Sequence, residues 1–155
     1  MNFREMRLLR LSCGVIVLLV AACSSEDDQT SAEVSLYDRL GGLAPIAVVV
    51  SDFLDAVALD PVLNQNAAVA AAREHAPAPY IKYQITAQVC EATGGPCRYG
   101  GRSMRDTHTG LNITDGEWDR MIVIFEETLA KHNVPAQEQQ ELLDIIGSTK
   151  DDIVL

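Results

Sequence analysis

The stretch GGRSMRDTHTGLNITDGEW, residues 100–118, holds His108 in a short polar segment just before a pattern that starts a helix. The chain contains only three histidines. A single histidine is usually a surface residue or a hydrogen-bonded packing residue, and less often a metal or cofactor ligand. The role of His108 therefore has to be decided by the sequence around it.

Downstream of this stretch, Thr114 and Glu117 form a capping box that starts a helix running to about His132. Apolar residues recur in it at three- and four-residue steps, as on the buried face of a helix. They are Trp118, Met121, Ile122, Phe125 and Leu129. Pro135 begins the last predicted helix, which is again rich in leucine and isoleucine.

Upstream, capping residues, prolines and paired glycines divide the chain into further helices. Their expected bounds are residues 36–40, 46–58, 67–75 and 80–93. The second of them places Ile46, Val49, Val50, Phe53 and Val57 on one face. The sequence therefore predicts an all-α domain of five or six helices with no internal repeat.

The N-terminus has the composition of an export signal. Three arginines precede an apolar run at residues 11–22. This run is too short for a helix that spans a bilayer, which needs about 20 residues. The ending VAAC, residues 20–23, resembles the bacterial lipoprotein box, which implies cleavage before Cys23 and lipid on its sulfur. The alternative is an ordinary signal peptide with an incidental cysteine.

The polar, acidic residues 23–35 cannot build a core, so we expect a lipid-anchored tether ahead of a folded domain at residues 36–155. The tether begins Ser24-Ser25, without the aspartate that retains many lipoproteins at the inner membrane. We therefore expect a bacterial cell-envelope protein, anchored in the outer membrane and facing the periplasm.

The charge of the exported part excludes one class of partner. Residues 1–22 hold three of the 12 basic and one of the 22 acidic side chains, which leaves nine basic against 21 acidic and a net charge of −12. Nucleic-acid binding depends on neutralising phosphates with lysine and arginine, so we do not expect it here.

Two cysteines, Cys90 and Cys97, remain in the domain and flank EATGGP. Export would place them in an oxidising compartment, where disulfides persist, and a helix end followed by Gly-Gly-Pro can fold the chain back. We expect a disulfide. Two inert thiols or half of a metal site are the alternatives, although no further zinc ligands lie at short spacing.

The order of local motifs then narrows the fold. It comprises LYDRLGG at 36–42, DFLDAVALDP at 52–61, TGGPCRYGGRSM at 93–104, His108, LNIT at 111–114 and DDIV at 151–154. This order resembles the group I truncated haemoglobins over residues 36–154. The segment VCEATGGPC is similar to lipoprotein-type bacterial variants of that family.

The resemblance implies a truncated globin fold, a two-over-two helical sandwich around haem b. His108 matches the proximal histidine of the family, the ligand of the haem iron. A neutral imidazole fits that role because one nitrogen binds iron while the other N–H is oriented by an acceptor. The segment RYGGRSMRD resembles the extended loop that precedes a one-turn helix in the family.

The resemblance also implies the other residues of the cofactor pocket. They are Phe53, Leu54, Ile81, Ile85, Val89 and Met104. Leu54 stands where many members carry an oxygen-binding tyrosine, and Leu63 with small residues replaces a haem-packing phenylalanine after DP. Gln84 and Gln88 are the nearby amides, and helical spacing turns Gln84 partly away from the pocket.

We therefore expect a haem protein that reversibly binds oxygen, nitric oxide or carbon monoxide at iron, served by an unidentified reductase. Conversion of nitric oxide to nitrate would make it an enzyme, which the missing tyrosine argues against. The alternatives are a haem- or electron-transfer module in which a second ligand such as His75 closes the sixth position, and a haem-free anchored interaction module. His132 lies at an expected helix C-terminus, where the helix dipole favours a partly charged imidazole, and this suffices to explain its presence.

Overall fold

The computed structural model describes residues 33–154. The expected signal segment at residues 1–22, the lipid site Cys23 and residues 24–32 of the expected tether lie outside the described residues. Within the described part of the chain, no helix is long and apolar enough to cross a membrane.

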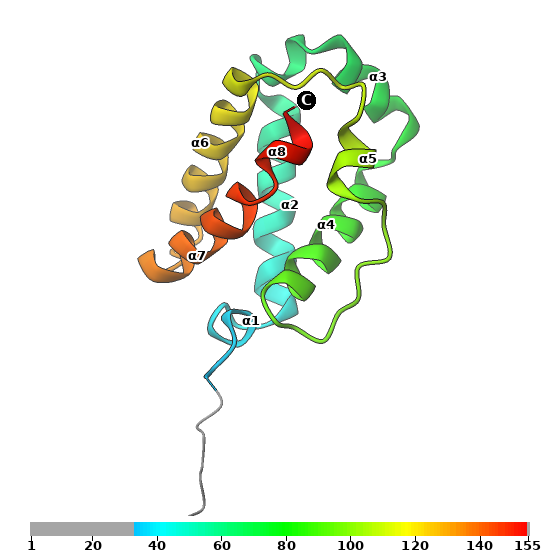
Figure 1. Cartoon of the computed structure of the whole chain (residues 1–155). Coiled ribbons are helices and arrows are strands. Elements are labelled where there is room, and N and C mark those ends of the chain that lie inside the picture. The colour runs from blue at the N-terminus through cyan, green and yellow to red at the C-terminus, as the bar shows by residue number, and fades with distance from the viewer. Residues whose placement is uncertain (1–32, 155) are drawn as a thin grey trace, which may run out of the picture. The chain divides into compact units, whose positions relative to one another are not determined.

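The described residues fold into α-helices, with one 3-10 turn and no strand (Figure 1). In chain order they are α1 (Leu36–Arg39), α2 (Leu43–Leu59), the 3-10 turn η1 (Leu63–Gln65), α3 (Ala67–His75), α4 (Ala78–Ala92), α5 (Met104–His108), α6 (Asp115–Lys131), α7 (Ala136–Gly147) and α8 (Lys150–Ile153). The predicted all-α class is therefore confirmed. The short elements η1 and α8 were not predicted, and together with the one-turn helix α5, which the resemblance implied, they raise the helix count above five or six.

The helix starts follow the capping residues of the sequence. Thr114 Oγ1 accepts from the backbone N–H of Glu117, and the Glu117 carboxylate accepts from the backbone N–H of Thr114 at 2.8 Å, which completes the predicted capping box of α6. Helix α2 begins at Leu43, earlier than expected, with Pro45 inside its first turn, where a missing N–H costs nothing.

Two helix pairs build the domain. Helix α2 packs against α4, α6 packs against α7, and α2 also contacts α6, which joins the pairs as in a two-over-two sandwich. The buried cluster between them consists of Leu36, Phe125, Leu129 and Leu142. Phe53 of α2 meets Phe125 of α6 edge-on, with ring centroids 5.2 Å apart. The core therefore lies along α6, against side chains of α1, α2 and α7.

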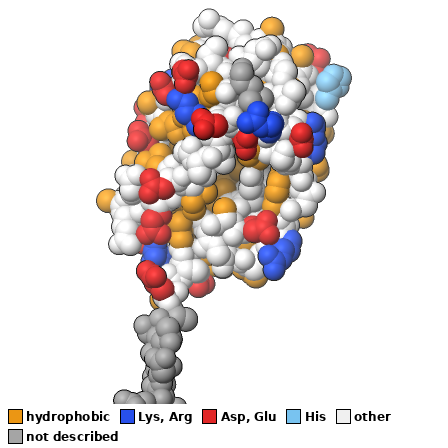
Figure 2. All heavy atoms as spheres, in the orientation of Figure 1, with side chains coloured by type: hydrophobic (Ala, Val, Ile, Leu, Met, Phe, Trp, Pro, Cys, Tyr) orange, Lys and Arg blue, Asp and Glu red, His pale blue; other side chains and the backbone are white. Residues whose placement is uncertain are grey.

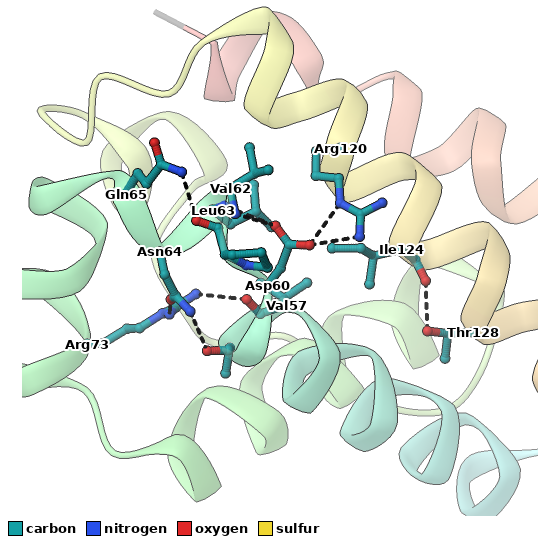
Figure 3. Close-up of polar contacts among 12 residues, drawn as sticks. Val57, Asp60, Val62, Leu63, Asn64, Gln65, Arg73, Arg120, Ile124 and Thr128 are labelled. Carbon is teal, nitrogen blue, oxygen red and sulfur yellow. Dashed lines mark hydrogen bonds and ion pairs between the residues drawn. The ribbon is translucent and has the colours of Figure 1, made fainter.

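A buried carboxylate ties the end of α2 to α6 (Figure 3). Asp60, the C-cap of α2, accepts from the backbone N–H groups of Val62 and Leu63, each at 3.0 Å, and from Arg120 Nε at 2.8 Å. The hydrogen bond from Arg120 is the largest cause of a lowered pKa for Asp60. Burying this group is tolerable because its charge is paired and its oxygens are hydrogen-bonded.

The C-terminal end of α4 is fixed by a disulfide. Cys90, which is fully buried, is joined to Cys97 with the two Cα atoms 5.7 Å apart. The turn between them packs tightly on α1: a Cβ at Gly95 would lie 2.5 Å from the Tyr37 ring and 2.7 Å from Cys90 Sγ. Only glycine fits at this position. The bridge and this close packing together hold the start of the loop that leads to α5.

Candidate functional site

His108 lies at the C-terminal end of the single turn α5, whose N-cap Ser103 accepts from the backbone N–H of Asp106. The Nδ1 atom of His108 lies 2.7 Å from the backbone oxygen of Met104. Because a carbonyl oxygen only accepts, Nδ1 carries the proton of the neutral ring. The lone pair is then on Nε2, the arrangement that a metal-binding imidazole requires.

His108 lines a cavity of about 1250 Å³ that reaches from α5 across the domain. Most of its lining side chains are apolar, and Figure 2 shows such side chains gathered in a hollow below α8, between α7 and α4. The volume exceeds the ~300–1,000 Å³ typical of small-molecule pockets. The cavity is thus large enough and apolar enough for a macrocycle.

Three helices bring the predicted pocket residues together. All of them line this one cavity: Phe53 and Leu54 from α2, Ile81, Ile85 and Val89 from α4, and Met104 with His108 from α5. Leu63, at the place of the missing phenylalanine, is buried and also lines the cavity. Residues spread over more than fifty positions of sequence therefore share one site.

The polar side chains of the cavity differ from the expectation. Gln84, expected to turn partly away, lines the cavity and donates from Nε2 to the Tyr80 hydroxyl at 2.7 Å. Tyr80 is 57% exposed, which places this pair at the rim, and Gln88 lines the cavity as well. Tyr80 was not predicted at the cavity, because the expected helix began at that residue, whereas α4 begins two residues earlier, at Ala78.

The other two histidines take different positions. His75 is exposed at the end of α3 and is not among the described residues that line the cavity. His132 caps α6, borders the cavity and places Nε2 2.8 Å from Asp52 Oδ2. Hydrogen bonds from Lys131 and then His132 lower the pKa of Asp52. This contact was not predictable from local patterns, because its partners are 80 residues apart.

The family of bacterial-like globins matches residues 35–154 of the chain. This chain is a bacterial-like globin. The group 1 truncated hemoglobin of Nostoc sp. (strain MUN 8820) is 31% identical over 119 residues, which cover 75% of this chain and 93% of the relative. The group 1 truncated hemoglobin of Mycolicibacterium paratuberculosis is 28% identical, with coverage of 73% and 79%. The globin therefore belongs to the group I truncated branch.

Solved structures show the same fold. The truncated hemoglobin of Tetrahymena pyriformis in its Fe(III) form superposes with a TM-score of 0.69 at 23% identity, covering 78% of this globin and 98% of that chain. The 2/2 hemoglobin of Synechococcus sp. PCC 7002, described with covalently attached heme, gives 0.68 at 27% identity and the same coverage. The predicted truncated globin fold is confirmed.

Membership of this family implies haem as the cofactor. The described residues fit the group, since a large apolar cavity is lined by His108, whose Nδ1 is held by a backbone oxygen and whose Nε2 is left as a donor atom. Haem iron in globins is held by such a histidine, and a hydrogen bond to the other ring nitrogen is among the features that tune the iron. The chemistry of the donor and the shape of the cavity are therefore consistent with each other.

Proposed function

We propose that His108 would hold the iron of a haem b in this globin, and that the haem would supply reversible binding of oxygen, nitric oxide or carbon monoxide. The observation that carries the proposal is the hydrogen bond from His108 Nδ1 to Met104, on a ring that lines the cavity. It leaves Nε2 as the donor atom. Iron, when bound, supplies the gas chemistry, and the chain supplies ligation and exclusion of water.

The residues of α2 and α4 that we assign to the gas-binding side are Leu54, Ile81 and Ile85, all of which line the cavity. None of these three side chains can donate a hydrogen bond to a bound ligand, whereas the amides of Gln84 and Gln88, which also line the cavity, can. The proposed role is reversible gas binding for storage, delivery or sensing. Oxidation of nitric oxide to nitrate would make the globin an enzyme, and Leu54 in place of the family's tyrosine argues against that activity.

We further propose that the globin works in the bacterial cell envelope. The support is the sequence of residues 1–35, with a basic and apolar segment, the VAAC box and an acidic tether. Cleavage before Cys23 and lipid attachment would anchor the domain to the outer membrane on its periplasmic side. The disulfide between Cys90 and Cys97 suits an oxidising compartment of this kind.

The cavity also bears on the alternatives. A haem-free interaction module would gain nothing from a large apolar cavity, whereas the described residues keep one of about 1250 Å³. A six-coordinate transfer module needs a second ligand, and the exposed His75 lies outside the cavity lining. Neither alternative is favoured by a contact in the structure.

Visible spectra of the purified domain, residues 33–155, test the proposal. We expect a Soret band after addition of haem, a five-coordinate ferrous form, and a carbon monoxide complex typical of histidine-ligated globins. Failure to bind haem would support the interaction module. A low-spin ferric and ferrous spectrum at rest would support the transfer module instead.

A further inference from the structure

Helix α5 is too short to fix the position of His108 by itself. It comprises five residues, and the stretch from Gly94 to Ser103 before it forms no regular element. A single helical turn is unstable in isolation, because several backbone angles are fixed for each hydrogen bond gained. Contacts from outside the turn must therefore hold it.

The C-terminal turn α8 supplies such contacts. Arg105 of α5 donates from Nε to Asp152 Oδ1 at 3.0 Å and from Nη2 to the backbone oxygen of Asp151 at 3.0 Å. Its Nη2 also lies 2.8 Å from Asp152 Oδ1. The guanidinium of Arg105, one turn before His108, thus binds both a side chain and a backbone group of α8.

Helix α8 is itself held from the other side. Lys150 Nζ lies 2.8 Å from Asp115 Oδ1 in the first turn of α6. This hydrogen bond is the largest cause of a raised pKa for Lys150, with Asp119 and Asp151 adding to it. Thr149, the N-cap of α8, and Ile153 line the cavity. Helix α8 lies between α6 and α5 (Figure 1), and it contacts both through these ion pairs.

We propose that α8 acts as a clasp for the iron-binding site, and that Arg105 and Asp152 are positioning residues that set the orientation of His108. The inference rests on the proposed function, since it concerns the ligand named there. The clasp runs from the first turn of α6 through Lys150 and Asp152 to Arg105. Loss of any link lets α5 rotate without removing a group that contacts haem.

The test uses the haem-loaded domain and the variant Arg105→Gln. The matched control is Arg98→Gln: Arg98 lies in the loop before α5, and its ion pair among the described residues is with Glu91 of α4 at 3.4 Å. We expect Arg105→Gln to release haem to apomyoglobin about two- to fivefold faster, the range that one solvent-exposed ion pair allows. We also expect its iron–histidine stretching band in the ferrous, ligand-free resonance Raman spectrum to shift or broaden.

The reversed pair Arg105→Glu with Asp152→Arg should restore the haem-release rate and the band toward wild type. Release rates and bands equal to those of Arg98→Gln would overturn the clasp. So would a change in urea unfolding of the haem-free domain without any change in the band, which would mean a merely structural role. If His108→Ala keeps a histidine-ligated spectrum, the proposed function fails instead, and the two failures are distinguishable.

Discussion

The imidazole of His108 and the backbone oxygen of Met104 lie 2.7 Å apart, one helical turn from each other. This contact orients the ring and puts the proton on Nδ1, so the position of α5 decides where the lone pair of Nε2 points. Met104 and His108 are the first and last residues of the same short helix, so the helix itself fixes the acceptor relative to the ring. The first prediction follows from that arrangement.

Replacing His108 with alanine should abolish stable haem binding or leave a haem whose five-coordinate spectrum returns on addition of imidazole. The reason is that the described cavity lining would lose the imidazole that we assign to iron. Absorbance titration with haem measures the effect. His75→Ala is the matched control and should keep the carbon monoxide spectrum, while an unaltered Soret band in His108→Ala would refute the assignment.

Leu54→Tyr should slow the release of oxygen roughly fivefold or more, because a hydrogen bond to a polar ligand in an apolar pocket is worth about 1 kcal/mol or more. Stopped-flow displacement of oxygen by carbon monoxide measures the rate. Leu54→Phe adds the same ring without a hydroxyl and serves as the control. Equal rates in the two variants would show that Leu54 lies away from the bound gas.

Removing the disulfide with Cys90→Ala and Cys97→Ala should lower the free energy of unfolding by about 2 kcal/mol, since the closed loop is short. Urea denaturation of the haem-free domain measures this difference. The same double variant should also lose haem faster, because the loop that leads to α5 starts at the bridge. Unchanged stability on reduction of the wild type would contradict the first part.

The ion pair of Asp60 and Arg120 should make stability depend on pH. The pKa of Asp60 is lowered in the folded state below its ordinary value of 3.8, chiefly by the hydrogen bond from Arg120. Its stabilisation is therefore complete well above pH 3.8 and is lost as the pH falls from there through the folded pKa.

Asp60→Asn should accordingly destabilise the domain at neutral pH, with a difference from wild type that shrinks below pH 4. Thermal unfolding over a pH series gives the comparison. Asp55→Asn removes an exposed partner of Lys82 and should have little effect at any pH. A difference that persists undiminished at pH 2 would rule out titration of Asp60 as its source.

Cys23→Ser in the full chain should release the protein from bacterial membranes, because the sulfur that we propose for lipid attachment is gone. Membrane fractionation and intact mass spectrometry measure the change. The wild-type mass should lack residues 1–22 and include the lipid. Membrane association and mass that stay the same in both proteins would contradict lipidation.

Local chemistry made much of this fold predictable. The capping box at Thr114 and Glu117 was confirmed, as was the glycine pair at 41–42, where φ values of 86° and 85° suit glycine alone. Such signals act within a few residues and need no knowledge of the rest of the chain. The position of His108 came from the resemblance, because one histidine in a polar stretch carries too little information alone.

The contacts that the sequence did not predict join distant positions. Arg105 and Asp152 are 47 residues apart, and both look like ordinary solvated charges in the sequence. Tyr80 reached the cavity rim because α4 starts at Ala78, and helix starts between two prolines are poorly defined by local patterns. Pairing over such separations depends on packing that only the folded chain reveals.

The tight fit at Gly95 has a consequence for protein engineering. A designer who grafts the Cys90–Cys97 bridge onto another globin to stiffen it would have to transplant the glycine as well as the cysteines. Any β-carbon at that position would collide with the sulfur of the bridge and with the aromatic ring beneath it. The unit to transplant is therefore the whole turn together with Tyr37 of α1, whose ring packs against it.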